Sequence, residues 1–226
     1  MVTTGILFDV DGTLVDTNYL HTICWHDALR TGDHVVPMNV LHRSIGMGSE
    51  ELLDHVLGND RDRAADGDIV HAHNVYYQRH WTRLTLLPSA DALLRACAGL
   101  GHHVVLASSA ADDELAALRK VLDCEEVIAA ATSGSDVEAA KPKPDLVQVA
   151  LDKGGLKAAA SVFVGDSVWD AHACASAGVA FVGLACGGTS SYELTAAGAV
   201  EVWHDPADLL DHLDASAVGK LAQGAG

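Results

Sequence analysis

Short runs of consecutive apolar residues alternate with helical patterns along most of the chain. Because the apolar residues are consecutive rather than alternating, each run is typical of a strand covered by helices on both faces. The repeated strand–helix order predicts an α/β fold with a doubly wound parallel sheet. The strand-like runs are GILFDV at 5–10, HHVVLAS at 102–108, EVIAA at 126–130, SVFVGD at 161–166 and VAFVGL at 179–184. The helical patterns lie at about 90–100, 112–122, 144–153 and 168–177.

One long segment interrupts this alternation. Between Thr17 and Leu86 there is no strand-like run, and the apolar positions have helical spacing throughout. We therefore predict a small helical cap domain at 17–86, inserted into a Rossmann-like core made of residues 1–16 and 87–226.

Composition and charge exclude several classes of protein. The 226 residues carry a formal charge of −17, which opposes binding to nucleic acid and to anionic membranes. A site for phosphate must therefore bring its own local cations. The five cysteines are scattered and contain no C-x-x-C pair, so neither a disulfide framework nor a zinc site is indicated. With no signal-peptide pattern at the start and no apolar run of about 20 residues, we expect a cytoplasmic protein.

The ends of the strand-like runs carry the first chemical signal. Asp9, Ser108 and Asp166 each end a run, and the carboxyl ends of parallel strands meet at one edge of a sheet, where ligands collect. In FDVDGTLVD, Asp9 and Asp11 are two residues apart, and Gly12 allows a sharp turn directly after them. A simple Asp-Gly turn at a strand end is the alternative interpretation.

The string FDVDGTLVD resembles the first motif of the haloacid dehalogenase superfamily, in its phosphotransferase form with two aspartates. The resemblance implies that Asp9 attacks phosphorus to form an aspartyl-phosphate. It implies that Asp11 protonates the leaving oxygen and later activates water. Both roles are chemically reasonable for a carboxylate pair. Gly12 and Thr13, which follow in the motif, are expected to contact the substrate.

Two further segments resemble the second and third motifs of this superfamily. VVLASSA would place the Ser108 hydroxyl on a phosphate oxygen with Ser109 beside the substrate, although a serine at a strand end is commonly a turn or helix cap. AAKPKPD contains Lys141, whose ammonium would bind both the nucleophile and the phosphoryl group. Lys143 is the neighbouring competitor, but the family pattern K-P-x-P-D selects Lys141.

A fourth segment, VFVGDSVWDAHAC, resembles the G-D-x-x-x-D motif that holds Mg²⁺ in this superfamily. The resemblance implies a site made of the Asp9 side chain, the main-chain carbonyl of Asp11, and Asp166. Asp170 would bind directly or through water. Oxygen ligands are those that Mg²⁺ prefers. A helix that merely begins with an aspartate is the alternative for this segment alone.

The position of the predicted cap resembles the phosphoglycolate phosphatase and β-phosphoglucomutase branch. DTNYLHTICWHDAL matches the pattern of that branch at His21 and Trp25, so His21 is expected to contact the substrate or to pack beside it. Ser49 stands where the mutase would have an arginine. The predicted cap contains no lysine, which disfavours a Schiff-base phosphonatase, and Asp11 would have no purpose in a dehalogenase. Arg43 is the candidate for reading a second anionic group, with a surface salt bridge as the alternative.

These motifs together predict a Mg²⁺-dependent phosphatase that acts on a small phosphorylated metabolite. A β-phosphoglucomutase-like isomerase and a catalytically silent binding module remain the alternatives. We expect a monomer or homodimer, with neither nucleic acid nor membrane as a partner.

Overall fold

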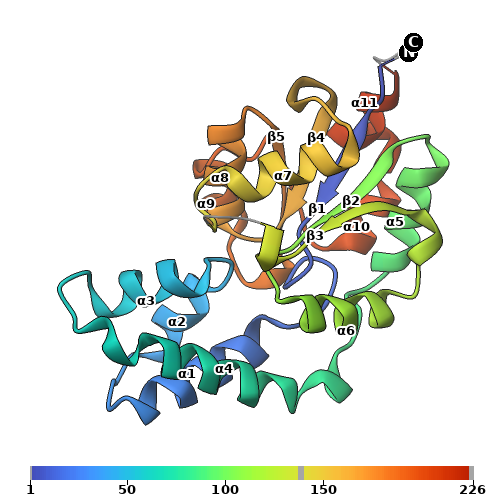
Figure 1. Cartoon of the computed structure of the whole chain (residues 1–226). Helices are drawn as coiled ribbons and strands as arrows, with labels where there is room; N and C mark the ends of the chain where they lie inside the picture. Colours follow the sequence, from blue (N-terminus) through green and yellow to red (C-terminus); the bar gives the residue numbers. More distant parts are fainter. Residues whose placement is uncertain (1, 137–139, 224–226) are drawn as a thin grey trace.

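A single parallel sheet of six strands organises the chain in the computed structural model, which describes residues 2–136 and 140–223. The strand order is β3-β2-β1-β4-β5-β6, and every neighbouring pair is parallel. The order reverses between β2–β1 and β1–β4, so β1 lies in the middle of the sheet (Figure 1). The strands are β1 (Gly5–Phe8), β2 (His103–Ala107), β3 (Ile128–Thr132), β4 (Ser161–Gly165), β5 (Ala180–Leu184) and β6 (Glu201–Trp203).

The predicted doubly wound α/β fold is confirmed. Five strands lie at the predicted runs, although β3 begins at Ile128 rather than at 126. The sequence did not indicate β6, because this edge strand has only the three residues Glu201–Trp203, too few to give a recognisable pattern.

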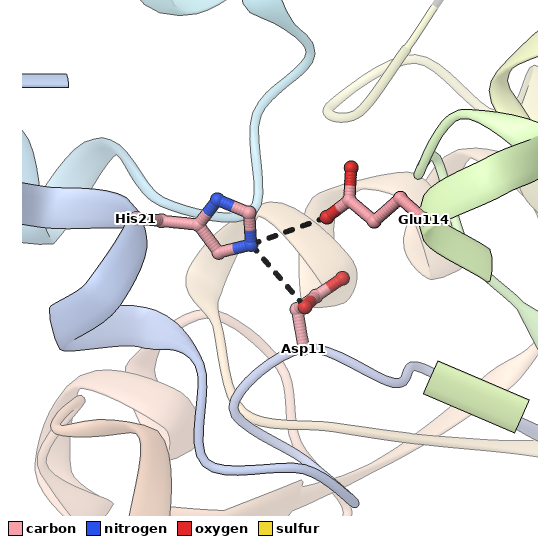
Figure 2. A group of neighbouring side chains, drawn as sticks. All are labelled: Asp11, His21 and Glu114. Carbon is pink, nitrogen blue, oxygen red and sulfur yellow. Dashed lines mark hydrogen bonds and ion pairs between the residues drawn. The ribbon is translucent and has the colours of Figure 1, made fainter. Parts of the chain in front are cut away.

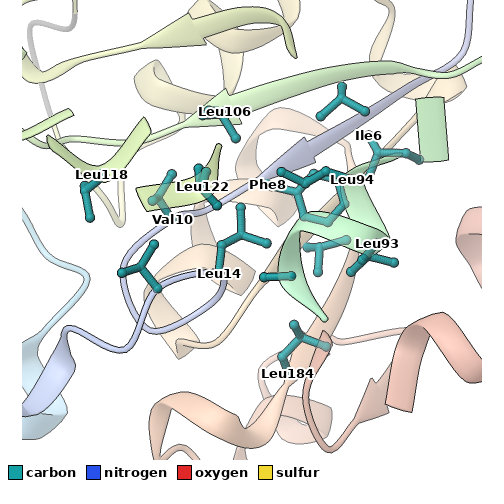
Figure 3. Packing of buried hydrophobic residues seen from close by; sticks show 14 of the residues in the cluster. Ile6, Phe8, Val10, Leu14, Leu93, Leu94, Leu106, Leu118, Leu122 and Leu184 are labelled. Atoms are coloured by element: carbon teal, nitrogen blue, oxygen red, sulfur yellow. The ribbon is translucent and has the colours of Figure 1, made fainter. Parts of the chain in front are cut away.

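Helices cover both faces of the sheet. In β1, Ile6 and Phe8 face one helical layer (Figure 3). Leu7 faces the other layer, as the pleat of a strand requires. The first face is covered by α5 (Ala90–Gly99), α6 (Asp112–Leu122), α10 (Pro206–Asp211) and α11 (Ala217–Gln223). The second is covered by α7 (Asp145–Gly154), α8 (Val168–Ala177) and α9 (Ser191–Ala196).

Short 3-10 helices occupy several connections between these elements. They are η1 (Arg63–Ala65), η2 (Trp81–Arg83), η3 (Glu125–Val127), η4 (Gly134–Asp136), η5 (Ala158–Ala160), η6 (Ala185–Gly187) and η7 (Leu213–Ala215). Of these, η6 follows β5 directly and brings its backbone to the carboxyl edge of the sheet.

A helical segment between β1 and α5 lies across the carboxyl end of the sheet (Figure 1). It contains a separate apolar cluster that includes Trp25, Leu29, Leu41, Leu53 and Ile69. This separate cluster favours the predicted cap at 17–86, but the exact division of the chain into two domains stays a prediction. Its helices are α1 (Asn18–Thr31), α2 (Met38–Ser44), α3 (Ser49–Leu57) and α4 (Asp66–Gln78).

The helical segment is joined to the core by two neighbouring stretches of chain. Val15 and Leu86 form an antiparallel bridge. The Asp16 N–H donates to the Thr85 carbonyl at 3.0 Å, and the Leu87 N–H donates to the Leu14 carbonyl at 2.9 Å. Within the described residues, no helix has both the length and the apolar character needed to cross a bilayer.

Candidate active site

The carboxyl ends of the two central strands bring buried aspartates together. Asp9 follows β1 and Asp166 follows β4, and both side chains are almost fully buried. The Asp9 N–H donates to the Val164 carbonyl at 2.9 Å, which continues the pairing of β1 with β4 by one residue. The predicted convergence of strand ends therefore holds for these two residues.

Lys141 lies between two carboxylates. Its Nζ is 2.8 Å from Oδ1 of Asp9 and 2.8 Å from Oδ1 of Asp170, and its side chain is only 2% exposed. Burial by itself would lower the pKa of Lys141, but Asp170 and Asp9 outweigh it and raise that pKa. Lys141 is therefore a permanent local cation. The competing Lys143 is exposed, and its Nζ is 3.4 Å from Glu51.

Asp9, Asp166 and Asp170 form a compact oxygen cluster. One carboxylate oxygen from each lies within 4.8 Å of the others. Burial and the negative charge of Asp170 raise the pKa of Asp166 to about 7, and burial raises the pKa of Asp9 against the opposing charge of Lys141. Three buried carboxylates with one ammonium leave uncompensated negative charge, which a divalent cation would offset. An oxygen-only donor set of this kind suits Mg²⁺.

Asp166 and Asp170 are both held by hydrogen-bond donors. Thr13 Oγ1 donates to Oδ1 of Asp166 at 2.9 Å, and Asn18 Nδ2 donates to its Oδ2 at 2.8 Å. Ser167 Oγ donates to Oδ2 of Asp170 at 2.6 Å, as part of a capping box at the start of α8. The hydroxyl of Thr13, predicted to contact substrate, is therefore already engaged by Asp166.

A second group of titratable side chains surrounds His21 (Figure 2). His21 Nε2 lies 3.3 Å from Oδ1 of Asp11 and 3.5 Å from Oε1 of Glu114. Burial opposes ionisation of Asp11, but the hydrogen bond with His21 lowers its pKa overall. Burial likewise lowers the pKa of His21, but the hydrogen bond with Asp11 raises it overall. Asp11 and His21 therefore share one proton in their hydrogen bond.

The other side of His21 is packed against rings. Its Nδ1 is 3.2 Å from Nε2 of His73, and its ring stacks on Tyr77 with centroids 3.8 Å apart. Burial and the nearby His21 charge lower the pKa of His73 to about 3, so His73 is neutral. Its Nδ1 lies 3.0 Å from the Asn74 side-chain oxygen, which only accepts. His73 therefore carries its proton on Nδ1, and its Nε2 accepts from His21.

Some of these groups line a cavity of about 360 Å³ between the sheet edge and the helical segment, whereas Asp166 and Asp170 are not in its wall. The core contributes Asp9, Asp11, Ser109, Glu114 and Lys141 to its wall. The helical segment contributes His21, Trp25, Met47, Ser49 and Asn74. The arrangement therefore presents a buried carboxylate, a cation and a second carboxyl group to one cavity.

Ser108 and Arg43 were predicted to face the substrate, but neither is in the cavity wall. Ser108 is fully buried, its Oγ accepts the Ala110 N–H at 3.1 Å, and it is not in the cavity wall, whereas Ser109 is. Arg43, at the end of α2, is more than half exposed and pairs with Glu193 of α9, outside the cavity. The surface ion pair, which was the alternative for Arg43, describes its position, because Glu193 holds the guanidinium away from the cavity.

Three residues of the site were not predicted. Asn18 donates to Asp166, Glu114 contacts His21, and Gly187 packs so tightly on Asp166 that an added Cβ would overlap its carboxylate. Glu114 had a signal in the sequence, because it lies four residues before Leu118 on the apolar side of a predicted helix. Gly187 follows a predicted strand end. Asn18 had no signal, since its partner is 148 residues away.

The remaining glycine of the first motif has a conformational role. Gly12 has φ +72°, and a Cβ there would run into the side chain of Asn18. Glycine is therefore required for the turn that carries the chain from Asp11 towards α1. Whether Gly12 also contacts substrate stays a prediction.

Comparisons with known proteins agree with this geometry. The family profile of haloacid dehalogenase-like hydrolases matches residues 3–178. A phosphoglycolate phosphatase of Neisseria gonorrhoeae is 30% identical over 189 residues, which are 81% of this chain and 80% of that protein. A hydrolase from Pseudomonas syringae has a crystal structure that superposes with a TM-score of 0.88 at 31% identity, covering 94% of this chain and 99% of that one.

A more distant structure resembles the fold alone. The β-phosphoglucomutase of Clostridium difficile superposes with a TM-score of 0.82 at 17% identity, covering 100% of this chain and 99% of that one. The profile match covers most of the chain, and the aspartates and lysine of the four motifs are gathered at one sheet edge. The chain therefore belongs to the haloacid dehalogenase-like hydrolases and is an enzyme of their phosphatase kind.

Proposed function

We propose that this enzyme is a Mg²⁺-dependent phosphatase that hydrolyses a small phosphate monoester through an aspartyl-phosphate on Asp9. The observation that carries the proposal is the pairing of the buried Asp9 carboxylate with Lys141 in the wall of a cavity that also exposes Asp11. A nucleophile, a cation and an acid/base group are thereby close to one bound phosphoryl group.

The reaction has two balanced steps. In the first, a carboxylate oxygen of Asp9 forms a bond to phosphorus, the bond from phosphorus to the ester oxygen breaks, and Asp11 passes the proton that it shares with His21 to the departing alkoxide. In the second, water attacks phosphorus, its proton passes to Asp11, and the bond between phosphorus and Asp9 breaks. Lys141 attracts the negative oxygens of the phosphoryl group throughout.

Asp9, Asp166 and Asp170 are the residues that would hold Mg²⁺, with the carbonyl of Asp11 as a further ligand from the family resemblance. Mg²⁺ bound there would keep Asp9 ionised and would attract the negative charge of the phosphoryl group.

The substrate is a small metabolite. A cavity of about 360 Å³ has room for a compact ester. Several relatives are named phosphoglycolate phosphatase, and one, from Bacillus pumilus, is named pyrophosphatase PpaX. These names suggest a substrate with a short leaving group. A mutase that handles two phosphate groups is disfavoured, because Lys141 is the one lysine or arginine among the described residues of the cavity wall.

Release of inorganic phosphate tests the proposal. The protein would be assayed with Mg²⁺ against p-nitrophenyl phosphate and a panel of small phosphate esters, and Asp9→Asn would be the matched inactive variant. We expect turnover by the natural protein and a loss of at least about 10³-fold in Asp9→Asn, since the amide is nearly isosteric but a poor nucleophile. Turnover that persists in Asp9→Asn, or interconversion of sugar phosphates without phosphate release, would contradict the proposal.

A further inference from the structure

We propose that Glu114 is a positioning residue that orients the His21 imidazole towards Asp11. The inference depends on the proposed function, because the protonation role of Asp11 is part of it. It concerns a residue outside the four sequence motifs, supplied by the first turn of α6.

The imidazole of His21 has contacts at both ring nitrogens and on one face of the ring. Nε2 lies between Asp11 and Glu114, which come from different elements, at 3.3 and 3.5 Å (Figure 2). Nδ1 faces His73, and one face of the ring stacks on Tyr77. With Asp11 on one side of Nε2 and Glu114 on the other, the ring cannot turn about its bond to Cβ without losing one of these contacts.

Glu114 has no evident structural reason to face this cavity. Its carboxylate is only 13% exposed, and among the described residues the one basic group within ion-pair distance is His21. Burial raises the pKa of Glu114 to about 7, so its position carries a cost in stability. The exposed Asp112 and Asp113 already provide negative charge to the first turn of α6. The carboxylate of Glu114 is therefore not needed to stabilise α6, and its contact with His21 best explains its position.

The consequence falls on leaving-group protonation. His21 contacts Asp11 and so fixes the direction of the Asp11 carboxyl group, which must face the departing oxygen. An alkyl phosphate needs that proton, because a free alkoxide is a poor leaving group, whereas p-nitrophenolate leaves readily without it. Loss of Glu114 should therefore harm the first ester much more than the second.

The test compares kcat/KM for ethyl phosphate and p-nitrophenyl phosphate in Glu114→Gln, with Asp113→Asn as the matched control on the exposed side of the same turn. We expect Glu114→Gln to lose on the order of 10- to 100-fold on ethyl phosphate and less than about 3-fold on p-nitrophenyl phosphate. Asp113→Asn should match the natural protein on both esters. Glu114→Asp, which keeps the charge but shortens the side chain, should give an intermediate loss.

A double-mutant cycle with His21→Gln distinguishes a positioning role of Glu114 from a purely structural one, because it measures whether the two losses in kcat/KM depend on each other. If Glu114 acts through His21, Glu114→Gln should cause no further loss in the His21→Gln background. Equal losses on the two esters, losses that multiply in the double variant, or no loss at all would overturn the proposal. The urea concentration at half unfolding should not fall in Glu114→Gln, since a buried charge is removed. A fall would show that Glu114 stabilises the folded structure instead of positioning His21. Failure of the proposed function looks different, because the natural protein would then release phosphate from neither ester.

Discussion

Gly187 determines how closely the loop after β5 can approach Asp166. An added Cβ would overlap the Asp166 carboxylate, while Asn18 holds that carboxylate from the other side and also donates to the Gly187 carbonyl at 3.0 Å. A glycine at this position therefore positions Asp166, the proposed metal ligand, through backbone packing alone.

Gly187→Ala should displace Asp166 and raise the Mg²⁺ concentration needed for half-maximal activity by about 10-fold or more, as is usual when a group that orients a ligand is lost. The matched control is Gly99→Ala at the end of α5, where an added Cβ meets no other atom. Titration of phosphatase activity with Mg²⁺ would measure both. An unchanged Mg²⁺ requirement in Gly187→Ala would mean that the loop after β5 moves to make room for the added Cβ and that Asp166 keeps its position.

At this scale the sequence predicted the residues that lie at strand ends and missed those that depend on distant parts of the chain. Asp9 and Asp166 could be placed because parallel strands bring their carboxyl ends together. Asn18 and Glu114 could not, because their contacts join α1 to the loop after β4 and α6 to α1. The ion pair of Arg43 could not be predicted either, because its partner, Glu193, lies 150 residues away.

The first turn of α8 joins a helix cap to the active site. Ser167 and Asp170 form a capping box, and the second oxygen of Asp170 pairs with Lys141. The same serine that begins the helix thus also fixes the carboxylate of Asp170 beside Lys141. Helix α9 begins with a similar capping box, formed by Ser190 and Glu193, on the surface.

This pair of caps allows a matched comparison. Ser167→Ala and Ser190→Ala should each lower the free energy of unfolding by about 1 kcal/mol, the usual cost of losing an N-cap hydroxyl. Only Ser167→Ala should also lower kcat, because only it releases Asp170. Urea unfolding and phosphate release would measure the two effects. Equal kcat values for both variants would show that the hydrogen bond from Ser167 to Asp170 does not affect catalysis.

Among the elements, the strands made of consecutive apolar residues and the helices of ten or more residues in the core were predicted well, whereas β6 and the short helices near the C-terminus were not. The core strands are continuous apolar runs, and α5 to α8 have clear periodicity. β6, α9, α10 and α11 have between three and seven residues. Elements of that length form because they pack against the rest of the sheet. The local sequence pattern does not indicate this packing.

The whole molecule concentrates negative charge both on its surface and in its centre. The chain has a formal charge of −17, and within residues 2–136 and 140–223 Lys141 is the one cation that pairs with the buried Asp9 and Asp170. Self-repulsion of this kind destabilises the compact state. A cation that binds the folded protein at Asp9, Asp166 and Asp170 should stabilise it strongly.

We therefore expect Mg²⁺ at about 100 times its Kd to raise Tm by roughly 5–10 °C, which corresponds to about 2.7 kcal/mol for a protein of this size. Differential scanning fluorimetry would measure the shift, with NaCl at equal ionic strength as the control for simple screening. Asp166→Asn should lose most of the shift. An equal shift with NaCl would show that screening, and not a specific site, is responsible.

The two neighbouring stretches that join the helical segment to the core have a consequence for protein engineering. Asp16 and Thr85 already face each other as hydrogen-bonded partners in an antiparallel pair, with Val15 opposite Leu86 just before them. A two-residue hairpin turn could therefore replace residues 17–84 without changing the register of that pair. A foreign domain whose two ends lie close together could be inserted at this junction, above the proposed phosphate site. The same catalytic core could then be combined with different domains that contact the leaving group.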